Sequence, residues 1–157
     1  MKIEDICYLS GLFDADGCAS SHIAKKKNTN YTIKVHSCEI SMTNKEVIYW
    51  VKNTVGFGNI YYSSDESHLV AVRDNSSDVV WQNEELQYRD LTAPKTISNY
   101  VAVADFEGYL HLISQIDGRI IGRTRIDNDG VRSNLIVEDG SLIVYGNGGS
   151  LVSLTIE

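Results

Sequence analysis

Two aspartates stand one residue apart near the start of the chain, in Asp14-Ala15-Asp16-Gly17. Carboxylates at this spacing followed by glycine are typical of a calcium loop of the EF-hand type, whose twelfth position is a glutamate. In a loop that starts at Asp14, the twelfth residue is Lys25, so an EF-hand is excluded. An Asp-Gly pair is also an ordinary way to end a helix, and this leaves a purely structural role open.

Other metal chemistry has little support in the sequence. Cys7, Cys18 and Cys38 form no CxxC pair, so a zinc ribbon is not expected. An odd number of cysteines and an N-terminus without an export signal predict reduced thiols and a cytoplasmic location. No stretch is apolar over the roughly 20 residues of a membrane span. His22 and His36 are interpreted as surface strand residues.

The elements that must position these residues follow from periodicity and turn residues. Apolar side chains at helical spacing predict a first helix, and a glycine after it fits a left-handed stop. Alternating side chains predict strands, and a Thr-Asn pair predicts the cap of a second helix. The first helix is expected from about Ile6 to Gly17, capped by Glu4 or Asp5, and is followed by strands over 18–24 and 31–42 that a basic turn joins. A second helix is expected from Thr43 or Asn44 to about Gly56, and a strand over 60–62 follows it.

The residues of the first helix and its surroundings resemble the LAGLIDADG family of homing endonucleases. Leu9-Ser10-Gly11-Leu12-Phe13-Asp14-Ala15-Asp16-Gly17 is similar to the motif itself. Ile40-Ser41-Met42-Thr43-Asn44-Lys45 is similar to the entry of the family's second helix, and Val55-Gly56-Phe57-Gly58 to its exit. The resemblance implies an α+β unit of order αββαβ over residues 1–66, truncated because the family's fourth strand and third helix are missing.

The resemblance also implies a function. Family members pair two motif helices, so this chain would act as a homodimer through Gly11 and Ala15 and cleave double-stranded DNA. Asp16 would hold Mg²⁺ at the scissile phosphate, and Asn44 would position the attacking water. The expected DNA-binding residues are Lys25, Lys26, Lys27, Lys34 and His36. The lysine run is equally well explained as a solvated hairpin turn.

From His68 onward the sequence repeats with a step of 41 residues. Leu69, Leu110 and Leu151 share this step, as do Gly108 and Gly149. A step of about 40–45 residues with several short strands is typical of β-propeller blades. Turn residues separate the copies, and no helical period interrupts them. Residues 67–157 are therefore expected to form antiparallel all-β blades, about two and a quarter in number.

The repeat resembles the C-terminal part of the BamB family of outer-membrane assembly factors. The run Thr92-Ala93-Pro94 and the stretch from Val101 to Arg119 carry the similarity, which continues to the chain end. The resemblance implies a propeller scaffold for a protein partner, reached here through blade edges. Such blades are not expected to bind the quinone PQQ. His111 is expected to be packed or exposed rather than catalytic, and the acids are expected at turns and rims.

The charge of the chain changes at the same place. The total is −7, which does not indicate a nucleic-acid binder. All lysines except Lys95 precede residue 67, whereas all arginines follow it, and the net charge goes from −1 to −6. Two segments of different origin explain this shift. The functional hypotheses are a DNA-binding protein with endonuclease activity left open, a propeller scaffold, and a chimera or gene remnant without selected function.

Overall fold

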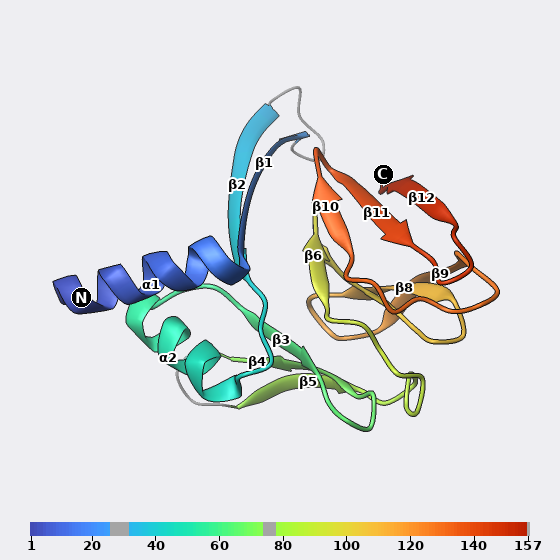
Figure 1. Cartoon of the computed structure of the whole chain (residues 1–157), viewed down its shortest axis with the longest axis horizontal. Coiled ribbons are helices and arrows are strands. Elements are labelled where there is room, and N and C mark those ends of the chain that lie inside the picture. The colour runs from blue at the N-terminus through green and yellow to red at the C-terminus, as the bar shows by residue number, and fades with distance from the viewer. Residues whose placement is uncertain (26–31, 74–77, 157) are drawn as a thin grey trace. The chain divides into compact units, whose positions relative to one another are not determined.

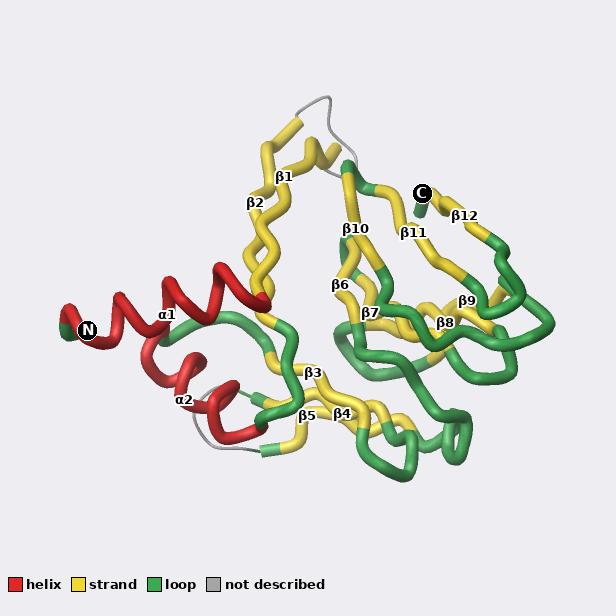
Figure 2. Tube along the Cα trace, viewed as in Figure 1, coloured by secondary structure: helices red, strands yellow, loops and turns green. Residues whose placement is uncertain are grey.

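The computed structural model describes residues 1–25, 32–73 and 78–156 (Figure 1). They divide into two compact units, residues 1–57 and 58–157. Within these residues the first unit is built from two helices and a hairpin, and the second from strands alone (Figure 2). No helix in the described ranges has the length and apolar character of a membrane span. The predicted boundary after residue 66 concerns the origin of the segments and stays a prediction.

Helix α1 spans Ile3–Asp16 and begins earlier than the sequence predicted. Lys2 is its N-cap, and the backbone N–H of Lys2 donates to the Asp5 carboxylate over 2.8 Å. The predicted cap at Glu4 or Asp5 is therefore wrong, because Asp5 serves the helix from inside its first turn. None of the residues of α1 is buried, although several are apolar.

Gly17 does not adopt the left-handed conformation that the sequence predicted. Its φ is −92° and its ψ is 155°, so the chain passes directly from α1 into strand β1 (Gly17–Lys25). The need for glycine has a different cause: a Cβ atom here would overlap the Phe13 ring and carbonyl oxygen. The close approach of the strand to the last helical turn excludes a side chain.

Strand β1 pairs antiparallel with β2 (Thr32–Ile40) along its whole length. Helix α2 (Lys45–Val55) follows, capped by Asn44 as predicted, and ends at Gly56 in the left-handed conformation with φ 81°. The pair β1–β2 forms a sheet of its own, and strand β3 (Ile60–Ser63) joins a different sheet. The strands expected in the first unit therefore do not share one sheet.

The described residues of the second unit form three antiparallel sheets, consistent with propeller-like blades. In chain order, a sheet of three strands comes first, a sheet of four strands second and a sheet of three strands third. The strands are β3 (Ile60–Ser63), β4 (Leu69–Val72) and β5 (Val79–Asn83); β6 (Lys95–Ile97), β7 (Tyr100–Ala104), β8 (Tyr109–Ser114) and β9 (Ile120–Arg125); and β10 (Ile136–Glu138), β11 (Ser141–Tyr145) and β12 (Leu151–Thr155).

The register of the sheets extends the 41-residue repeat back to residue 60. Ile60 pairs with Val72, Val101 with Ile113, and Leu142 with Leu154. Strand β3 therefore occupies the second-strand position of a blade. Residues 69–72 pair directly beside residues 60–63 in this sheet. The strand that precedes His68 thus also follows the 41-residue repeat.

Two apolar cores lie between the successive sheets. Val101 and Val103 of β7 face one core together with Leu69 and Trp81, whereas Ala102 and Ala104 face the other. Strand β7 is therefore buried on both faces, and this explains why its sequence is a continuous apolar run. Since each sheet covers its neighbour, the unit is held together by stacking of adjacent repeats.

Candidate functional site

Asp16 is the last residue of α1, and its side chain is exposed. Asp14 lies in the same final turn, and that turn carries no basic residue. Carboxylates at a helix C-terminus meet the negative end of the helix dipole and cost roughly 0.3–1 kcal/mol each. Helix stability therefore does not account for the acids at this end. The Asp16 backbone oxygen accepts from Ser41 N–H over 3.3 Å, which ties the hairpin to the helix.

Asn44 has a structural role that is visible directly. Its side-chain oxygen accepts from the Val47 backbone N–H over 3.2 Å and so satisfies one of the open donors at the start of α2. The side chain is exposed. A role for Asn44 in positioning water remains a prediction, and any test of it must preserve the helix cap.

The predicted DNA-binding residues lie on and beyond the hairpin. Lys26 and Lys27 fall outside the described residues, as do the side chains of Lys25 and Lys34. The backbone register pairs Lys25 with Thr32, Ile23 with Lys34 and Ser21 with His36. Paired residues and alternate residues of a strand share a face, so Lys25, Lys34 and His36 belong to one face of the hairpin. His36 is exposed.

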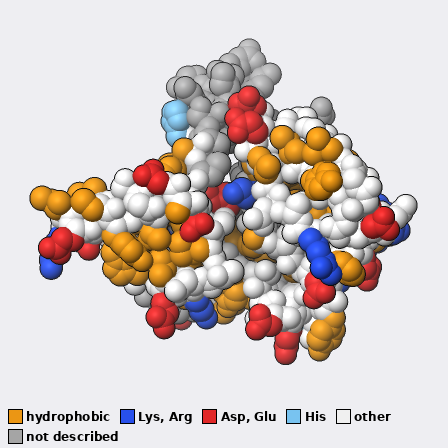
Figure 3. All heavy atoms as spheres, viewed as in Figure 1, with side chains coloured by type: hydrophobic (Ala, Val, Ile, Leu, Met, Phe, Trp, Pro, Cys, Tyr) orange, Lys and Arg blue, Asp and Glu red, His pale blue; other side chains and the backbone are white. Residues whose placement is uncertain are grey.

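Gly11 and Ala15 form an open stretch on α1. Both are exposed, and a Cβ added at Gly11 would meet no atom within 4 Å. The helix also exposes apolar side chains, including Ile3 at 80% and Ile6 at 52%. Figure 3 shows hydrophobic side chains gathered over the helical part of the first unit. A helix with this much uncovered apolar surface is typical of one that packs against a partner.

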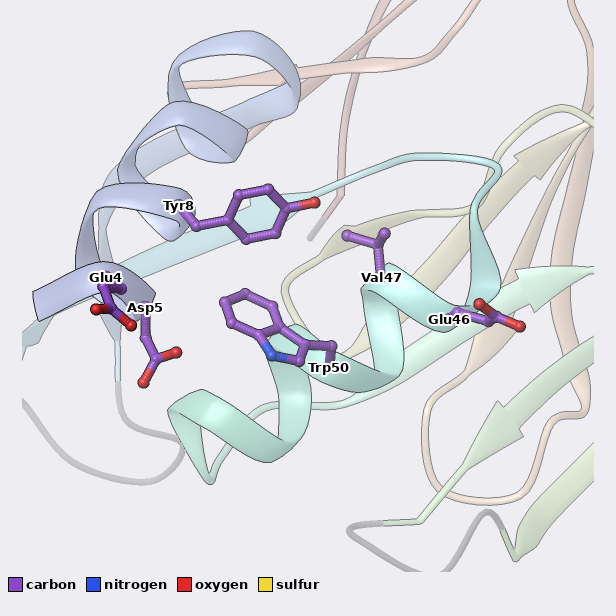
Figure 4. Close-up of a pocket in the computed structure, with 6 residues that line it drawn as sticks. All are labelled: Glu4, Asp5, Tyr8, Glu46, Val47 and Trp50. Atoms are coloured by element: carbon purple, nitrogen blue, oxygen red, sulfur yellow. The ribbon is translucent and has the colours of Figure 1, made fainter. Parts of the chain in front are cut away.

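An open hollow of about 470 Å³ lies between α1 and α2 (Figure 4). The Tyr8 and Trp50 rings meet edge to face across it, with centroids 5.0 Å apart. Glu4, Asp5 and Glu46 also line it, so its rim is acidic. Within the described residues, no group of three His, Cys, Asp or Glu side chains could hold a metal ion.

The second unit contains a buried ionic cluster that sequence reasoning missed. Asp105 and His111 are fully buried, and His111 Nε2 lies 2.8 Å from Asp105 Oδ2. Arg89 Nη1 donates to the same oxygen over 2.9 Å and to Glu107 Oε2 over 2.8 Å. The Tyr109 backbone N–H donates to Asp105 Oδ1 over 2.8 Å. Asp105 begins a turn, as expected for the acids of this region, because the Gly108 backbone N–H donates to its backbone oxygen. It is buried, however, and does not lie at an exposed rim.

The charge state of Asp105 follows from its partners. Burial acts to raise the pKa of this carboxyl, but hydrogen bonds from His111, the Tyr109 backbone and Arg89 outweigh burial and hold the pKa below its ordinary value of 3.8. Asp105 is thus an ionised carboxylate at the centre of a structural network within the middle blade. The sequence signal for this cluster was His111, which stands six residues after Asp105 in the same repeat copy.

Asp127 plays a related part in the last blade and is also largely buried. Its carboxylate accepts from the backbone N–H groups of Asp129, Gly148 and Ser150. In the repeat, Gly146 stands where Asp105 stands in the middle blade, and a Cβ at Gly146 would overlap the Asp127 side chain. Asp127 therefore supplies the turn-closing carboxylate that residue 146 lacks. Both buried aspartates are explained by stability.

Comparison with known proteins finds two different similarities in the chain. Residues 9–81 match the sequence model of the family described as LAGLIDADG endonuclease. The outer membrane protein assembly factor BamB of Pseudomonas aeruginosa is 43% identical over 112 residues, which is 71% of this chain and 30% of that protein. BamB of Escherichia coli is 30% identical over 99 residues, or 62% and 25% of the two chains. The chain thus spans less than a third of these relatives.

Solved structures similar to this chain also include a BamB protein. The crystal structure of BamB from Moraxella catarrhalis aligns with a TM-score of 0.58 and 30% identity over 62% of this chain and 29% of that one. The computationally designed Ika4 protein aligns with a TM-score of 0.57 over 64% of this chain and 62% of that one, at 13% identity, and so supports the fold alone.

The two similarities overlap in sequence. The alignment with the Pseudomonas protein covers more residues than the 76 that follow residue 81. The shared stretch must therefore include part of residues 9–81, and β3 and β4 lie where both descriptions can apply. The chain carries a LAGLIDADG endonuclease-like segment in its N-terminal region, fused to a C-terminal region similar to the propeller of BamB.

Proposed function

We propose that the first unit binds double-stranded DNA as a homodimer and cleaves it with Mg²⁺. The observation that carries this proposal is the open stretch of α1, where Gly11 and Ala15 are exposed and Asp16 directly follows. Small residues at this spacing allow two helix backbones to approach closely. A twofold pairing of this stretch with its copy brings two Asp16 carboxylates to one axis.

The chemistry of Asp16 suits the proposed metal. Mg²⁺ binds through one or two carboxylates together with substrate phosphates and water, and Asp16 is the carboxylate that each chain would contribute. The bound ion would stabilise the charge that develops as water attacks phosphorus. Asp16 would hold the ion, and Asn44 would orient water. The face of the hairpin with Lys25, Lys34 and His36 would meet DNA phosphates, to which lysines supply the salt-dependent part of the affinity.

The dimer and the cleavage are tested together with three proteins. The parent chain, Asp16→Asn and Gly11→Leu are incubated with supercoiled plasmid and Mg²⁺, and their masses are measured by sedimentation. We expect nicking or cutting by the parent, a dimer without cutting for Asp16→Asn, and a monomer without cutting for Gly11→Leu. A folded parent that is monomeric and inactive at all protein concentrations refutes the proposal. Cell fractionation tests the cytoplasmic location that DNA cleavage would require.

A second candidate function is protein binding through the blades. The observation that favours it is the free outer edge of the middle blade, where β9 is the last strand among the described residues of its sheet. An edge strand presents unpaired N–H and C=O groups that can pair with an extended segment of another protein. The relatives are named as assembly factors of outer membrane proteins. Absence of both DNA cleavage and protein binding would favour a gene remnant.

A further inference from the structure

The outer strand of the middle blade carries two arginines that stack on one tyrosine. The Arg123 and Arg125 guanidinium groups lie 4.7 Å and 5.1 Å from the centroid of the Tyr109 ring, and Arg125 Nη1 lies 3.4 Å from the Tyr109 hydroxyl. Both arginines are exposed. Stacking on an aromatic face holds a guanidinium in place while leaving its N–H groups available.

No carboxylate in the described part of the chain neutralises these two arginines. The ion pairs of this blade instead join Arg89 to Asp105 and Glu107, and Arg119 to Asp117. The chain as a whole carries a charge of −7. A pair of unneutralised, ordered arginines on an acidic protein marks a local site for an anionic group rather than a general basic surface.

The backbone of β9 shows which groups face outward. Ile126 N–H donates to the Gly108 oxygen over 2.8 Å, so residue 126 points toward β8. Hydrogen-bonded and non-hydrogen-bonded pairs alternate along an antiparallel ladder, and the register pairs Tyr109 with Arg125 and His111 with Arg123. Residues 123 and 125 therefore direct their backbone N–H and C=O groups to the free edge of the sheet.

We propose that the edge of β9 binds an extended peptide with acidic side chains at alternate positions. A peptide strand added here would pair with the backbone of residues 123 and 125. Its alternate side chains lie about 6.6–6.8 Å apart on one face, as do those of the two arginines. Arginine binds carboxylates through paired N–H groups, so glutamates at these positions fit. This proposal rests on the second proposed function and names its edge and ligand.

An acidic peptide fits these observations better than nucleic acid does. Nucleic-acid sites combine aromatic rings with a basic groove that follows the phosphate backbone over many residues. Here the basic character is confined to two residues beside a strand edge, and the backbone groups at that edge match a peptide. Residues 67–157, which include this edge, carry a net charge of −6, and this opposes binding of a long polyanion here.

The test measures binding of fluorescein-labelled peptides to the full chain by fluorescence anisotropy. The first peptide alternates valine and glutamate, and matched peptides carry glutamine or lysine in place of glutamate. We expect saturable binding of the glutamate peptide that weakens with salt. The double variant Arg123→Gln/Arg125→Gln should weaken it at least about tenfold, whereas Arg119→Gln, a control on the same blade, should not. Circular dichroism establishes that each variant is folded.

A charge reversal sharpens the result. Arg123→Glu/Arg125→Glu should bind the lysine peptide in preference to the glutamate peptide, which a merely misfolded variant would not do. Equal binding of all three peptides, unaffected by the arginine substitutions, overturns the acidic preference but leaves edge pairing intact. Absence of binding by any peptide overturns both this proposal and edge pairing. Tighter, arginine-dependent binding of a single-stranded oligonucleotide overturns the choice of a peptide ligand.

Discussion

Asp105→Asn is the substitution that most directly tests the buried cluster. Asparagine keeps the volume of aspartate, and its oxygen can still accept from the Tyr109 N–H. Its amide nitrogen, however, would face Arg89 Nη1, which lies 2.9 Å from Asp105 Oδ2. Loss of one hydrogen bond to a charged group costs about 1.5–3 kcal/mol, and the bonds to His111 and Tyr109 weaken as the charge disappears. We expect the free energy of unfolding to fall by about 2–4 kcal/mol.

The assay follows urea unfolding through tryptophan fluorescence. Trp50 lies in the first unit and Trp81 in a core of the second, so a Trp50→Phe background makes the signal report the blades. The midpoint should fall by about 1–2 M urea. Asp117→Asn is the matched control, because Asp117 pairs with the exposed Arg119 and sits at the surface. A shift for Asp105→Asn no larger than that of Asp117→Asn refutes the reasoning.

The pH dependence gives a second readout of the same cluster. The pKa of Asp105 is lowered in the folded chain. The ionised carboxylate therefore stabilises the fold at pH values above 3.8, the ordinary pKa of an aspartate. This contribution is lost as the pH falls through the lowered pKa of the folded state. The difference in unfolding free energy between parent and Asp105→Asn should thus be constant near neutral pH and shrink below about pH 4. A difference that grows on acidification contradicts this assignment.

Three further predictions concern single positions. Asp16→Asn should not destabilise the chain and should raise the thermal midpoint slightly, because it removes a charge from the negative end of α1; a clear loss of stability would show that Asp16 has a structural partner. Asn44→Ala should cost about 1 kcal/mol by removing the cap of α2, whereas Asn44→Asp should not, as measured by thermal unfolding. Gly108→Ala should lower the free energy of unfolding by several kcal/mol, because the φ of Gly108 is +88° and a Cβ there would overlap the Asp127 backbone. Gly149 is the equivalent residue of the next repeat and has open space around it, so Gly149→Ala should cost about 1–2 kcal/mol. Equal effects of the two substitutions would contradict the steric argument.

The local elements could be predicted where neighbouring residues decide the backbone. Asn44 caps α2 and Gly56 ends it, because a side-chain oxygen and a left-handed glycine act within one helical turn. The hairpin strands β1 and β2 were expected nearly at their observed bounds. The repeat of 41 residues indicated blades because each copy must bury the same positions against its neighbours.

The predicted caps of α1 were wrong, because the residue types at these positions suit more than one local conformation. Asp5 and Gly17 both have the residue types of helix caps, yet Asp5 lies inside the first turn and Gly17 begins a strand. The choice at Gly17 depends on the Phe13 ring, which leaves no room for a Cβ atom. Such a contact depends on where the chain goes next and is not encoded in the glycine itself.

The family motifs and the repeat were determined by the sequence alone, because short stretches of residue types carry them. Tertiary structure decided which strands share a sheet and which charged groups lose water. It placed β3 in a blade, since pairing with β4 continues the register of the repeat. It also enclosed Asp105 with His111, while it left Arg123 and Arg125 exposed on Tyr109. Burial and cross-strand neighbours arise from residues distant in sequence, and they set the chemistry of each charge.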